Sequence, residues 1–166
     1  MKILITGASG LIGSAVVQAA LASQEVTELI LAVRHPLPGT DPRISLVLVK
    51  DFLQTKDLTE SIRKADALIW CLGISQTQVS RSDYEKITYD FTVAMIRACL
   101  ENNPAIRFVF VSGDGADRTE KSRTLFKKTK GQGGKCITAI RFAFGHHCQT
   151  RCRASPRQKQ KSTLCL

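Results

Sequence analysis

The stretch TGASGLIG, residues 6–13, limits what this chain can fold into, because its three glycines recur at every third position. It begins at the last residue of the short apolar run ILIT, residues 3–6. It ends inside Leu11–Ala22, where apolar residues recur at helical spacing. In such a turn Gly7 permits the tight bend, Gly10 lets a pyrophosphate approach the backbone, and Gly13 lets the helix pack closely on the sheet. The stretch therefore predicts a strand, a phosphate-binding turn and a helix, against the alternative of an ordinary glycine-rich turn.

The rest of the first 130 residues alternates between apolar runs and helical patterns. Further apolar runs predict strands at Glu28–Val33, Ile44–Val49, Ala67–Leu72 and Arg107–Ser112. Helical patterns lie at Leu58–Lys64, Tyr84–Leu100 and Lys121–Lys130. Strands that alternate with helices in this way predict an α/β fold, a Rossmann-type doubly wound parallel sheet of about five strands. Because each run is continuously apolar, every strand is expected to be buried on both faces.

The charges and the cysteines divide the chain near residue 131. The formal net charge of +10 would by itself favour nucleic acid or acidic lipid as a partner. Residues 1–130 hold 17 basic and all 14 acidic residues, whereas residues 131–166 hold seven basic residues, no acid and four of the six cysteines. The basicity therefore belongs to the tail. We predict an NAD(P)-binding domain over residues 1–131 and a basic, cysteine-rich, disordered tail over residues 132–166.

The amino-terminal apolar run resembles a signal peptide in composition. However, Gly7, Gly10 and Gly13 interrupt it at the spacing of a phosphate-binding turn. No other run reaches the roughly 18 apolar residues that a membrane span requires. We therefore expect a cytoplasmic protein without a membrane partner.

Residues that follow the second and third predicted strands bear on the choice of cofactor. Arg34 stands where an NAD-binding site usually carries an acid for the ribose 2′-hydroxyl. An arginine there can pair with a 2′-phosphate, which favours NADP, although a solvated arginine at a strand end is the alternative. Asp51 and Phe52 are expected at the adenine end of the same crevice.

Residues 1–131 resemble an atypical short-chain dehydrogenase/reductase, an NAD(P)-binding protein of the Tat-interacting-protein-like or NmrA-like type. The stretches that carry the resemblance are TGASGLIG, LAVRHPLP, the DF pair at residues 51 and 52, WCLGISQT, YEKITYD, RFVFVSGDGAD and FKKTKG. The resemblance implies that Leu72, Gly73 and Ile74 flank the nicotinamide half of the cofactor. It also implies that Lys130 grips the nicotinamide ribose.

The chain departs from this family at the catalytic position. Reductases of the family place a tyrosine four residues before the lysine as a general acid, and Phe126 occupies that position here. Positioned acid–base catalysis is worth about 10² to 10⁴ in rate, so hydride transfer by the usual route should be badly impaired. Ser112 is the candidate for the assisting hydroxyl, with an ordinary strand end as the alternative.

The family continues after its KG pair with a helix and with a strand that ends in Arg-Pro, whereas this chain continues QGGKCITAIRFAFGHHCQTRC. Loss of one base would let codons for residues 132–150 encode RAENALRRFGLRSAIIARP. His146, His147, Cys148 and Gln149 have two codons each, and in that frame they permit only Ile or Thr, Ile or Thr, Ala or Val, and Lys or Arg. We therefore predict that the chain is out of frame after about residue 131, from a frameshift or from a sequencing error, so that it is in effect truncated and the C-terminal part of the fold is missing.

The expected site has two parts. The cofactor-binding residues are Thr6, Gly7, Ala8, Ser9, Gly10, Leu11, Ile12, Gly13, Arg34, Asp51, Phe52, Leu72, Gly73, Ile74 and Lys130, and the catalytic residues are Ser112 and Lys130. NADP is the expected cofactor, with NAD as the alternative, and the substrate is an unidentified small molecule. No metal and no specific nucleic acid are expected, because HHCQTRC lacks paired ligand spacing and the basic tail lacks aromatic residues. The alternatives to an oxidoreductase are a non-catalytic NADP(H) sensor and a nonfunctional product.

Overall fold

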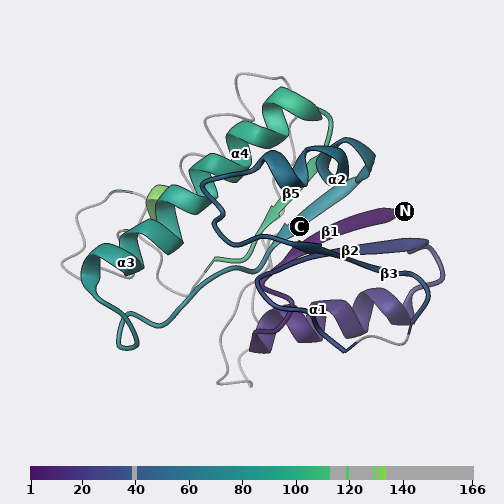
Figure 1. The fold of residues 1–166 in the computed structure, drawn as a ribbon, viewed down its shortest axis with the longest axis horizontal. Coiled ribbons are helices and arrows are strands. Elements are labelled where there is room, and N and C mark those ends of the chain that lie inside the picture. Colours follow the sequence, from purple (N-terminus) through teal and green to yellow (C-terminus); the bar gives the residue numbers. More distant parts are fainter. Residues whose placement is uncertain (39–40, 113–118, 120–128, 130, 134–166) are drawn as a thin grey trace. The chain divides into compact units, whose positions relative to one another are not determined.

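The structure, a computed structural model, describes residues 1–38, 41–112, 119, 129 and 131–133. Within them the strands are β1 (Lys2–Thr6), β2 (Glu28–Val33), β3 (Ile44–Leu48), β4 (Ala67–Trp70) and β5 (Arg107–Phe110) (Figure 1). The helices are α1 (Leu11–Ala22), the 3-10 turn η1 (Lys56–Leu58), α2 (Thr59–Lys64), α3 (Arg81–Glu85), the π-helical turn η2 (Lys86–Asp90) and α4 (Phe91–Asn102).

The strands form one sheet in the order β3-β2-β1-β4-β5. β1 pairs in parallel with β2 on one side and with β4 on the other, and β2 pairs in parallel with β3. The chain therefore builds outward from β1 to one edge of the sheet and then returns to build the other half. The predicted doubly wound α/β fold is confirmed, and its strand order reverses between β1 and β4.

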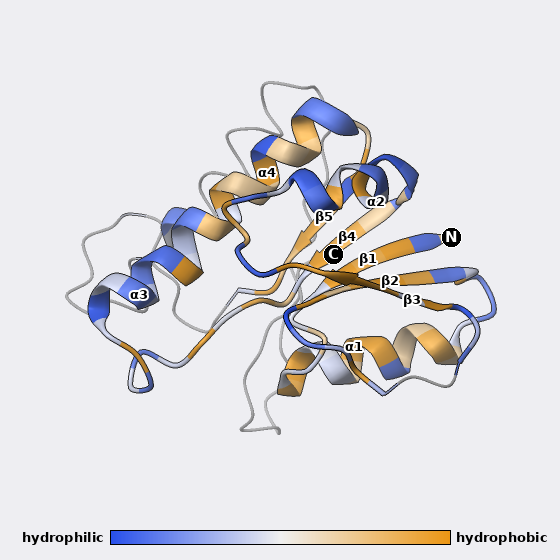
Figure 2. Cartoon of the chain, viewed as in Figure 1, coloured by the Kyte–Doolittle hydropathy of each residue, from blue (hydrophilic) through white to orange (hydrophobic). Residues whose placement is uncertain are grey.

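The sheet is mostly apolar, and Figure 2 shows its strands largely in the orange of hydrophobic residues. On one face, Ile5 and Leu31 of the sheet pack in one cluster with Val17 and Ala20 of α1. Each large side chain that is fully buried in this way contributes about 1.5–3 kcal/mol to folding. This cluster fixes α1, and with it the turn that precedes α1, against β1.

Aromatic packing dominates the other face of the sheet. Trp70 at the end of β4 is 1% exposed. Its ring lies 5.7 Å from that of Phe52, perpendicular to it, and 6.4 Å from that of Phe108. Phe52 thereby holds the segment after β3 close to the end of β4.

Two buried polar atoms lie beside each other in the strand register at this end of the sheet. Thr6 of β1 is the register partner of Trp70 of β4. Neither Thr6 Oγ1 nor Trp70 Nε1 has a hydrogen-bond partner among the described residues, although both residues are almost fully buried. Buried polar groups of this kind normally find a partner, so each is a local cost to folding.

β3 differs from the sequence expectation. It lies at an edge of the sheet, and its Leu46 and Leu48 are 39% and 52% exposed. The register places these two leucines on the same face as Leu31 and Val33, the face that α1 covers farther in. No helix lies between β2 and β3 in the described residues, so their connection supplies none to cover this face of β3. The prediction that every strand is buried on both faces is therefore wrong for β3.

Arg43 ties the start of β3 to the end of α1. Its guanidinium donates to the carbonyl oxygen of Leu21 at 2.8 Å and to those of Ser23 and Val26 at 3.4 Å. It also forms two hydrogen bonds with the Asp41 carboxylate, at 3.1 and 3.0 Å. A cation that caps the last carbonyls of a helix is favoured by the helix dipole. The Arg43 side chain thus fixes one edge strand against α1.

Contacts divide the chain into two compact units, one of Met1–Gly73 with Ala94–Val109 and one of Ile74–Val93 with the described residues from Phe110 onward. In the second unit Ser80 caps the amino terminus of α3, because its hydroxyl accepts a hydrogen bond from the Asp83 N–H at 3.1 Å. The residues described near the end of this unit are helical, and a β-carbon on Gly133 would lie 3.4 Å from the Phe110 ring. Residues 131–133 are thus helical, and the domain boundary at residue 131 stays a prediction.

Candidate dinucleotide site

The turn after β1 is held by backbone contacts that exclude a side chain at Gly7. Gly7 has φ of 69°, a conformation that L side chains rarely adopt. A β-carbon at this position would lie 2.8 Å from the carbonyl oxygen of Cys71, just past β4. The turn therefore needs glycine here for both its conformation and the close approach of β4.

The second and third glycines meet different surroundings. A β-carbon on Gly13 would lie 2.0 Å from the Gly7 carbonyl oxygen, a distance that no side chain can occupy. Among the described residues, a β-carbon on Gly10 would meet only that same oxygen, at 3.3 Å, so they leave the remaining space around Gly10 open. The Gly10 N–H donates to the Gly7 carbonyl at 3.0 Å and closes the turn. Gly7 and Gly13 thus allow close backbone contacts in the turn, while Gly10 leaves room for a ligand.

The amino terminus of α1 is suited to an anion. Gly10 precedes this 12-residue helix, no side chain caps its first N–H groups, and its first turn has no acid. Leu11 is 90% exposed, so solvent reaches this end of the helix. Uncapped N–H groups and the positive end of the helix dipole bind phosphate. The open space at Gly10 and these N–H groups therefore fit a pyrophosphate.

The other expected residues of this unit follow the carboxyl ends of neighbouring parallel strands, which meet at one edge of a sheet. Arg34 follows β2 and is exposed, while Leu72 and Gly73 follow β4. Ligands of doubly wound sheets bind at this edge, where the strand order reverses. The structure thus brings the glycine turn, Arg34 and the end of β4 to the edge where a dinucleotide would lie.

Asp51 and Phe52 follow β3 at the same edge. The Asp51 Oδ1 accepts a hydrogen bond from the Leu53 N–H at 3.0 Å, so this carboxylate shapes its own turn. The Phe52 side chain is 2% exposed and belongs to the core beside Trp70. The Phe52 ring is therefore part of the core and is not exposed at this edge.

The catalytic predictions remain predictions. Lys130 and Phe126 lie outside the described residues, and Ser112, half-buried, follows β5 in the second unit. Ile74 also belongs to the second unit. The described geometry therefore bears on the binding of the cofactor but not on the chemical step.

Cys71 is a residue that the sequence analysis missed. Its side chain is half-buried, but its carbonyl oxygen forms the wall that excludes a side chain at Gly7. A backbone contact of this kind does not depend on the identity of the side chain. The sequence therefore carries no signal for it.

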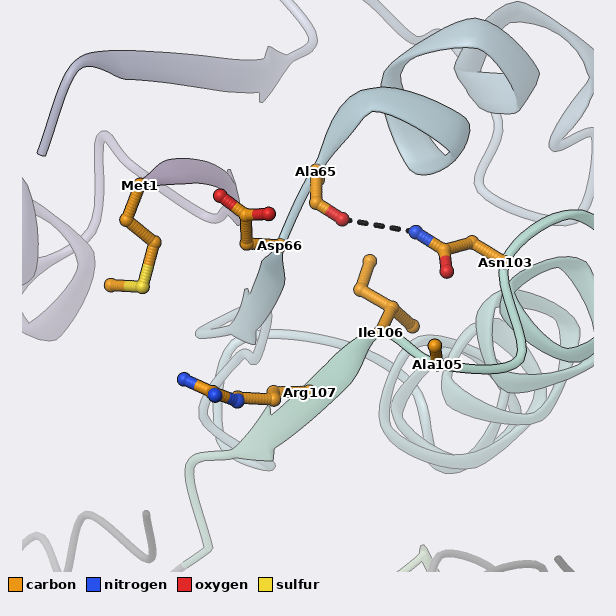
Figure 3. Close-up of a pocket in the computed structure, with 7 residues that line it drawn as sticks. All are labelled: Met1, Ala65, Asp66, Asn103, Ala105, Ile106 and Arg107. Atoms are coloured by element: carbon orange, nitrogen blue, oxygen red, sulfur yellow. Dashed lines mark hydrogen bonds between the residues drawn. The ribbon is translucent and has the colours of Figure 1, made fainter.

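A cavity of about 420 Å³ opens at the opposite, amino-terminal edge of the sheet (Figure 3). Asp66 and Asn103 lie in its wall, and the Asn103 amide donates to the Ala65 carbonyl at 3.0 Å. The Asp66 carboxylate accepts from the Lys2 N–H at 2.7 Å. These polar groups join the starts of β1 and β4 to the end of α4. None of the expected cofactor residues lines this cavity.

The part of the chain that the structure describes contains neither a metal-binding cluster nor a membrane-spanning helix. No group of three or more His, Cys, Asp or Glu residues there could hold a metal ion. No helix among the described residues is long and apolar enough to cross a membrane.

Comparisons with known proteins show what this chain is similar to. The chain is 28% identical over 122 residues to the leucinostatins biosynthesis cluster protein T of Purpureocillium lilacinum, covering 72% of this chain and 45% of that protein. It is 25% identical over 145 residues to the mitochondrial protein FMP52 of Eremothecium gossypii, covering 86% of this chain and 62% of that protein. The chain thus spans less than two thirds of the length of either relative.

The fold matches that of a solved UDP-glucuronic acid 4-epimerase from Bacillus cereus in complex with NAD. The TM-score is 0.69 at 20% identity, and the match covers 87% of this chain and 53% of the epimerase. Residues 7–137, well over half of the chain, match a protein family described as NAD(P)H-binding. The matched range begins at the first glycine of the turn, and the chain belongs to this NAD(P)H-binding family.

Proposed function

We propose that this chain is an oxidoreductase-like protein of the atypical short-chain dehydrogenase/reductase class that binds NADP in preference to NAD. The observation that carries the proposal is the glycine turn at the point where the strand order reverses, with open space at Gly10 and uncapped N–H groups at the start of α1. This combination holds a pyrophosphate in dinucleotide-binding folds.

The preference for NADP rests on Arg34. This residue is exposed at the end of β2 and makes no ion pair among the described residues, so its guanidinium is available to a 2′-phosphate. A planar guanidinium binds phosphate with two parallel hydrogen bonds, and its positive charge attracts the negative phosphate. NAD offers only a hydroxyl at the same position.

The nicotinamide ring, when bound, supplies the acceptor or donor of a hydride. On the side of the protein, Lys130 would hold the nicotinamide ribose and Ser112 would orient a substrate oxygen. Phe126 has no proton to give to that oxygen. Turnover would then require another donor, and the substrate is an unidentified small molecule. We place the protein in the cytoplasm.

A second candidate is a sensor that binds NADP(H) without turnover, and Phe126 at the general-acid position favours it. A third is a frameshifted and nonfunctional product, which the altered pattern after about residue 131 favours. The coding DNA decides the frameshift, because the other frame must continue the family pattern over residues 132–150.

The test is a titration of the full chain with NADPH and NADH, followed by nicotinamide fluorescence and by thermal stability. We expect saturable binding that stabilises the fold, and tighter binding of NADPH. Gly10→Asp should abolish binding of both, because a carboxylate would repel the pyrophosphate. Arg34→Glu should weaken NADPH alone.

Arg97→Glu is the matched control, since Arg97 is an exposed arginine on α4 and the change of charge is the same. It should leave both affinities unchanged. A folded protein that bound neither nucleotide would overturn the proposal, and tight binding without turnover of any carbonyl substrate would favour the sensor.

A further inference from the structure

We propose that the outer edge of β3 pairs with the β3 of a second copy of this chain, in antiparallel orientation about a two-fold axis at Leu46. The proposal concerns an interaction surface and does not rest on the proposed function. β3 is an edge strand of the sheet, and β2 is the only described strand that pairs with it. The five residues of β3, ISLVL, include no charged residue and no proline, which commonly keep an edge strand from pairing.

The backbone hydrogen bonds show which groups of β3 point outward. At the start of the strand, the Arg43 carbonyl oxygen accepts from the Leu29 N–H of β2 at 2.8 Å. At its end, the Val49 N–H donates to the Val33 carbonyl oxygen of β2 at 2.9 Å. Successive residues of a strand direct their backbone groups to opposite sides, so the odd-numbered residues of this segment face β2. The residues whose N–H and C=O groups point away from β2 are therefore Ile44, Leu46 and Leu48.

These outward groups are complementary to those of an antiparallel second copy. The Ile44 N–H already donates to the Asp41 carbonyl oxygen at 3.0 Å. Among the described residues, the donors that remain at this edge are the N–H groups of Leu46 and Leu48. With Leu46 opposite Leu46 of the second copy, each Leu46 N–H reaches the other Leu46 carbonyl oxygen, and each Leu48 N–H reaches an Ile44 carbonyl oxygen. Both donors of each edge then have an acceptor.

The same register pairs the exposed leucines with apolar side chains. Leu46 and Leu48 are 39% and 52% exposed, and half-buried Ile44 lies on the same face of the strand. Centring on Leu46 overlaps all five residues of both strands and places Leu48 against Ile44 of the second copy. A shift by two residues in either direction would instead place Lys50 or Pro42 opposite a residue of β3. Cross-strand apolar pairs stabilise a sheet, so this register is the favoured one.

The charged residues beyond the strand ends are complementary in this register. Lys50 comes opposite Pro42 of the second copy, next to its Asp41. Lys50 is exposed and makes no ion pair among the described residues. Because Asp41 forms an ion pair with Arg43 at 3.0 Å, Lys50 meets no unpaired positive charge there. A carboxylate has acceptor sites for a further cation, so Lys50 can bind Asp41 at both ends of the contact.

The geometry also sets the size of the assembly. A two-fold contact uses the β3 edge of each copy once, so it closes at a dimer and does not extend into a fibre. Stable interfaces involve about 20–30 residues on each side, far more than these short strands supply. We therefore expect a reversible dimer whose population rises with protein concentration.

The first experiment is sedimentation equilibrium of the full chain over a range of concentrations, for the wild type, Leu46→Lys and Leu53→Lys. Leu46→Lys places two like charges against each other at the two-fold axis and should weaken the dimer about ten-fold or more. Leu53→Lys is the matched control, since Leu53 is 44% exposed in the turn after β3 and lies outside the paired residues. It should dimerise as the wild type does. Thermal unfolding checks that each variant folds.

The second experiment tests the register. In a hydrogen-bonded antiparallel pair the two α-carbons lie about 5.5 Å apart, which suits a disulfide. Leu46→Cys should therefore link two copies in the presence of oxidised glutathione, and mass spectrometry should find a peptide joined to itself at residue 46. Leu53→Cys should give far less of the corresponding product. This measurement decides alone if Leu46→Lys does not fold.

A full chain that stays monomeric at every concentration would overturn the proposal. So would a dimer that Leu46→Lys and Leu53→Lys weaken equally and that does not link at residue 46, because its contact would lie elsewhere. Neither outcome bears on the titration with NADPH and NADH, so this inference and the proposed function can fail separately.

Discussion

The carbonyl oxygen of Gly7 lies only 2.0 Å from the position that a β-carbon on Gly13 would occupy. The contact is between backbone and backbone, so no rotamer change can relieve a side chain placed there. Gly10, midway between them in sequence, lacks this restriction, because its β-carbon would meet the same oxygen at 3.3 Å and nothing else nearby in the described part of the chain. The close packing of the backbone therefore requires glycine at position 13 but not at position 10.

Gly13→Ala should destabilise the fold by about 1–3 kcal/mol or more, because α1 must move away from the turn. Gly10→Ala, the matched variant, should cost less than half as much. The free energy of unfolding in urea measures both. Equal losses in the two variants would contradict the assignment of Gly13 to packing.

Asp41 makes stability depend on pH. Hydrogen bonds from Arg43 hold the pKa of the Asp41 carboxyl below its ordinary value of 3.8. A lowered pKa in the folded state adds stability above the unfolded value, and this contribution is lost as the pH falls below about 3.8. Asp41→Asn should therefore be less stable than the wild type at pH 7, with the difference shrinking toward pH 3. Urea midpoints at both pH values test this.

Asp57→Asn is the control for that experiment. Asp57 is exposed in η1 and has no ion pair among the described residues. Its replacement should leave the midpoint nearly unchanged at both pH values. A difference for Asp41→Asn that persisted unchanged to pH 3 would mean that its carboxylate is not the source of the effect.

The Cys99 thiol should resist alkylation in the folded protein. It is 3% exposed on α4, and burial raises its pKa to about 12. Only the thiolate reacts, so at pH 8 native Cys99 should remain unmodified by iodoacetamide while urea exposes it. Half-buried Cys71 should react sooner. Peptide mass spectrometry distinguishes the two, and rapid modification of Cys99 without urea would contradict its placement in the core.

Thr6→Val should stabilise the protein by about 1 kcal/mol, since it replaces a buried hydroxyl that has no hydrogen-bond partner with a methyl group of similar size. The unfolding free energy of the variant measures this. Lower stability would show that the hydroxyl has a partner in solution, such as a buried water.

The start of the fold could be predicted from the sequence because local signals there agree. The glycine spacing and the helical pattern predicted α1 at Leu11–Ala22, where it lies, and β2 also has the predicted bounds. The first strand begins one residue earlier than expected, at Lys2. Apolar runs and turn residues sufficed for these elements because neighbours in sequence decide them.

Elements that depend on distant contacts were predicted less well. β4 ends at Trp70 and not at Leu72, since the following backbone turns against Gly7. The single helix expected at Tyr84–Leu100 begins earlier, at Arg81, and contains the π-helical turn η2. The exposed leucines of β3 depend on what covers an edge strand, which apolar runs alone do not reveal.

The candidate site shows the same division. The glycine turn and Arg34 directly follow β1 and β2, as the predicted strands implied, while their binding of the cofactor stays a prediction. The sequence did not predict that the Phe52 ring belongs to the core, since an aromatic residue after a strand suits either environment. Only its contact with Trp70 decides between them.

Trp70 is the only tryptophan in the chain. It lies at the end of β4, one residue before the backbone that packs against the glycine turn. All indole emission of the molecule therefore comes from one point, where the two halves of the sheet join and next to the edge proposed for the nucleotide. The protein carries a built-in optical probe whose spectrum would register loosening of that junction, or the arrival of a nicotinamide chromophore, without any label.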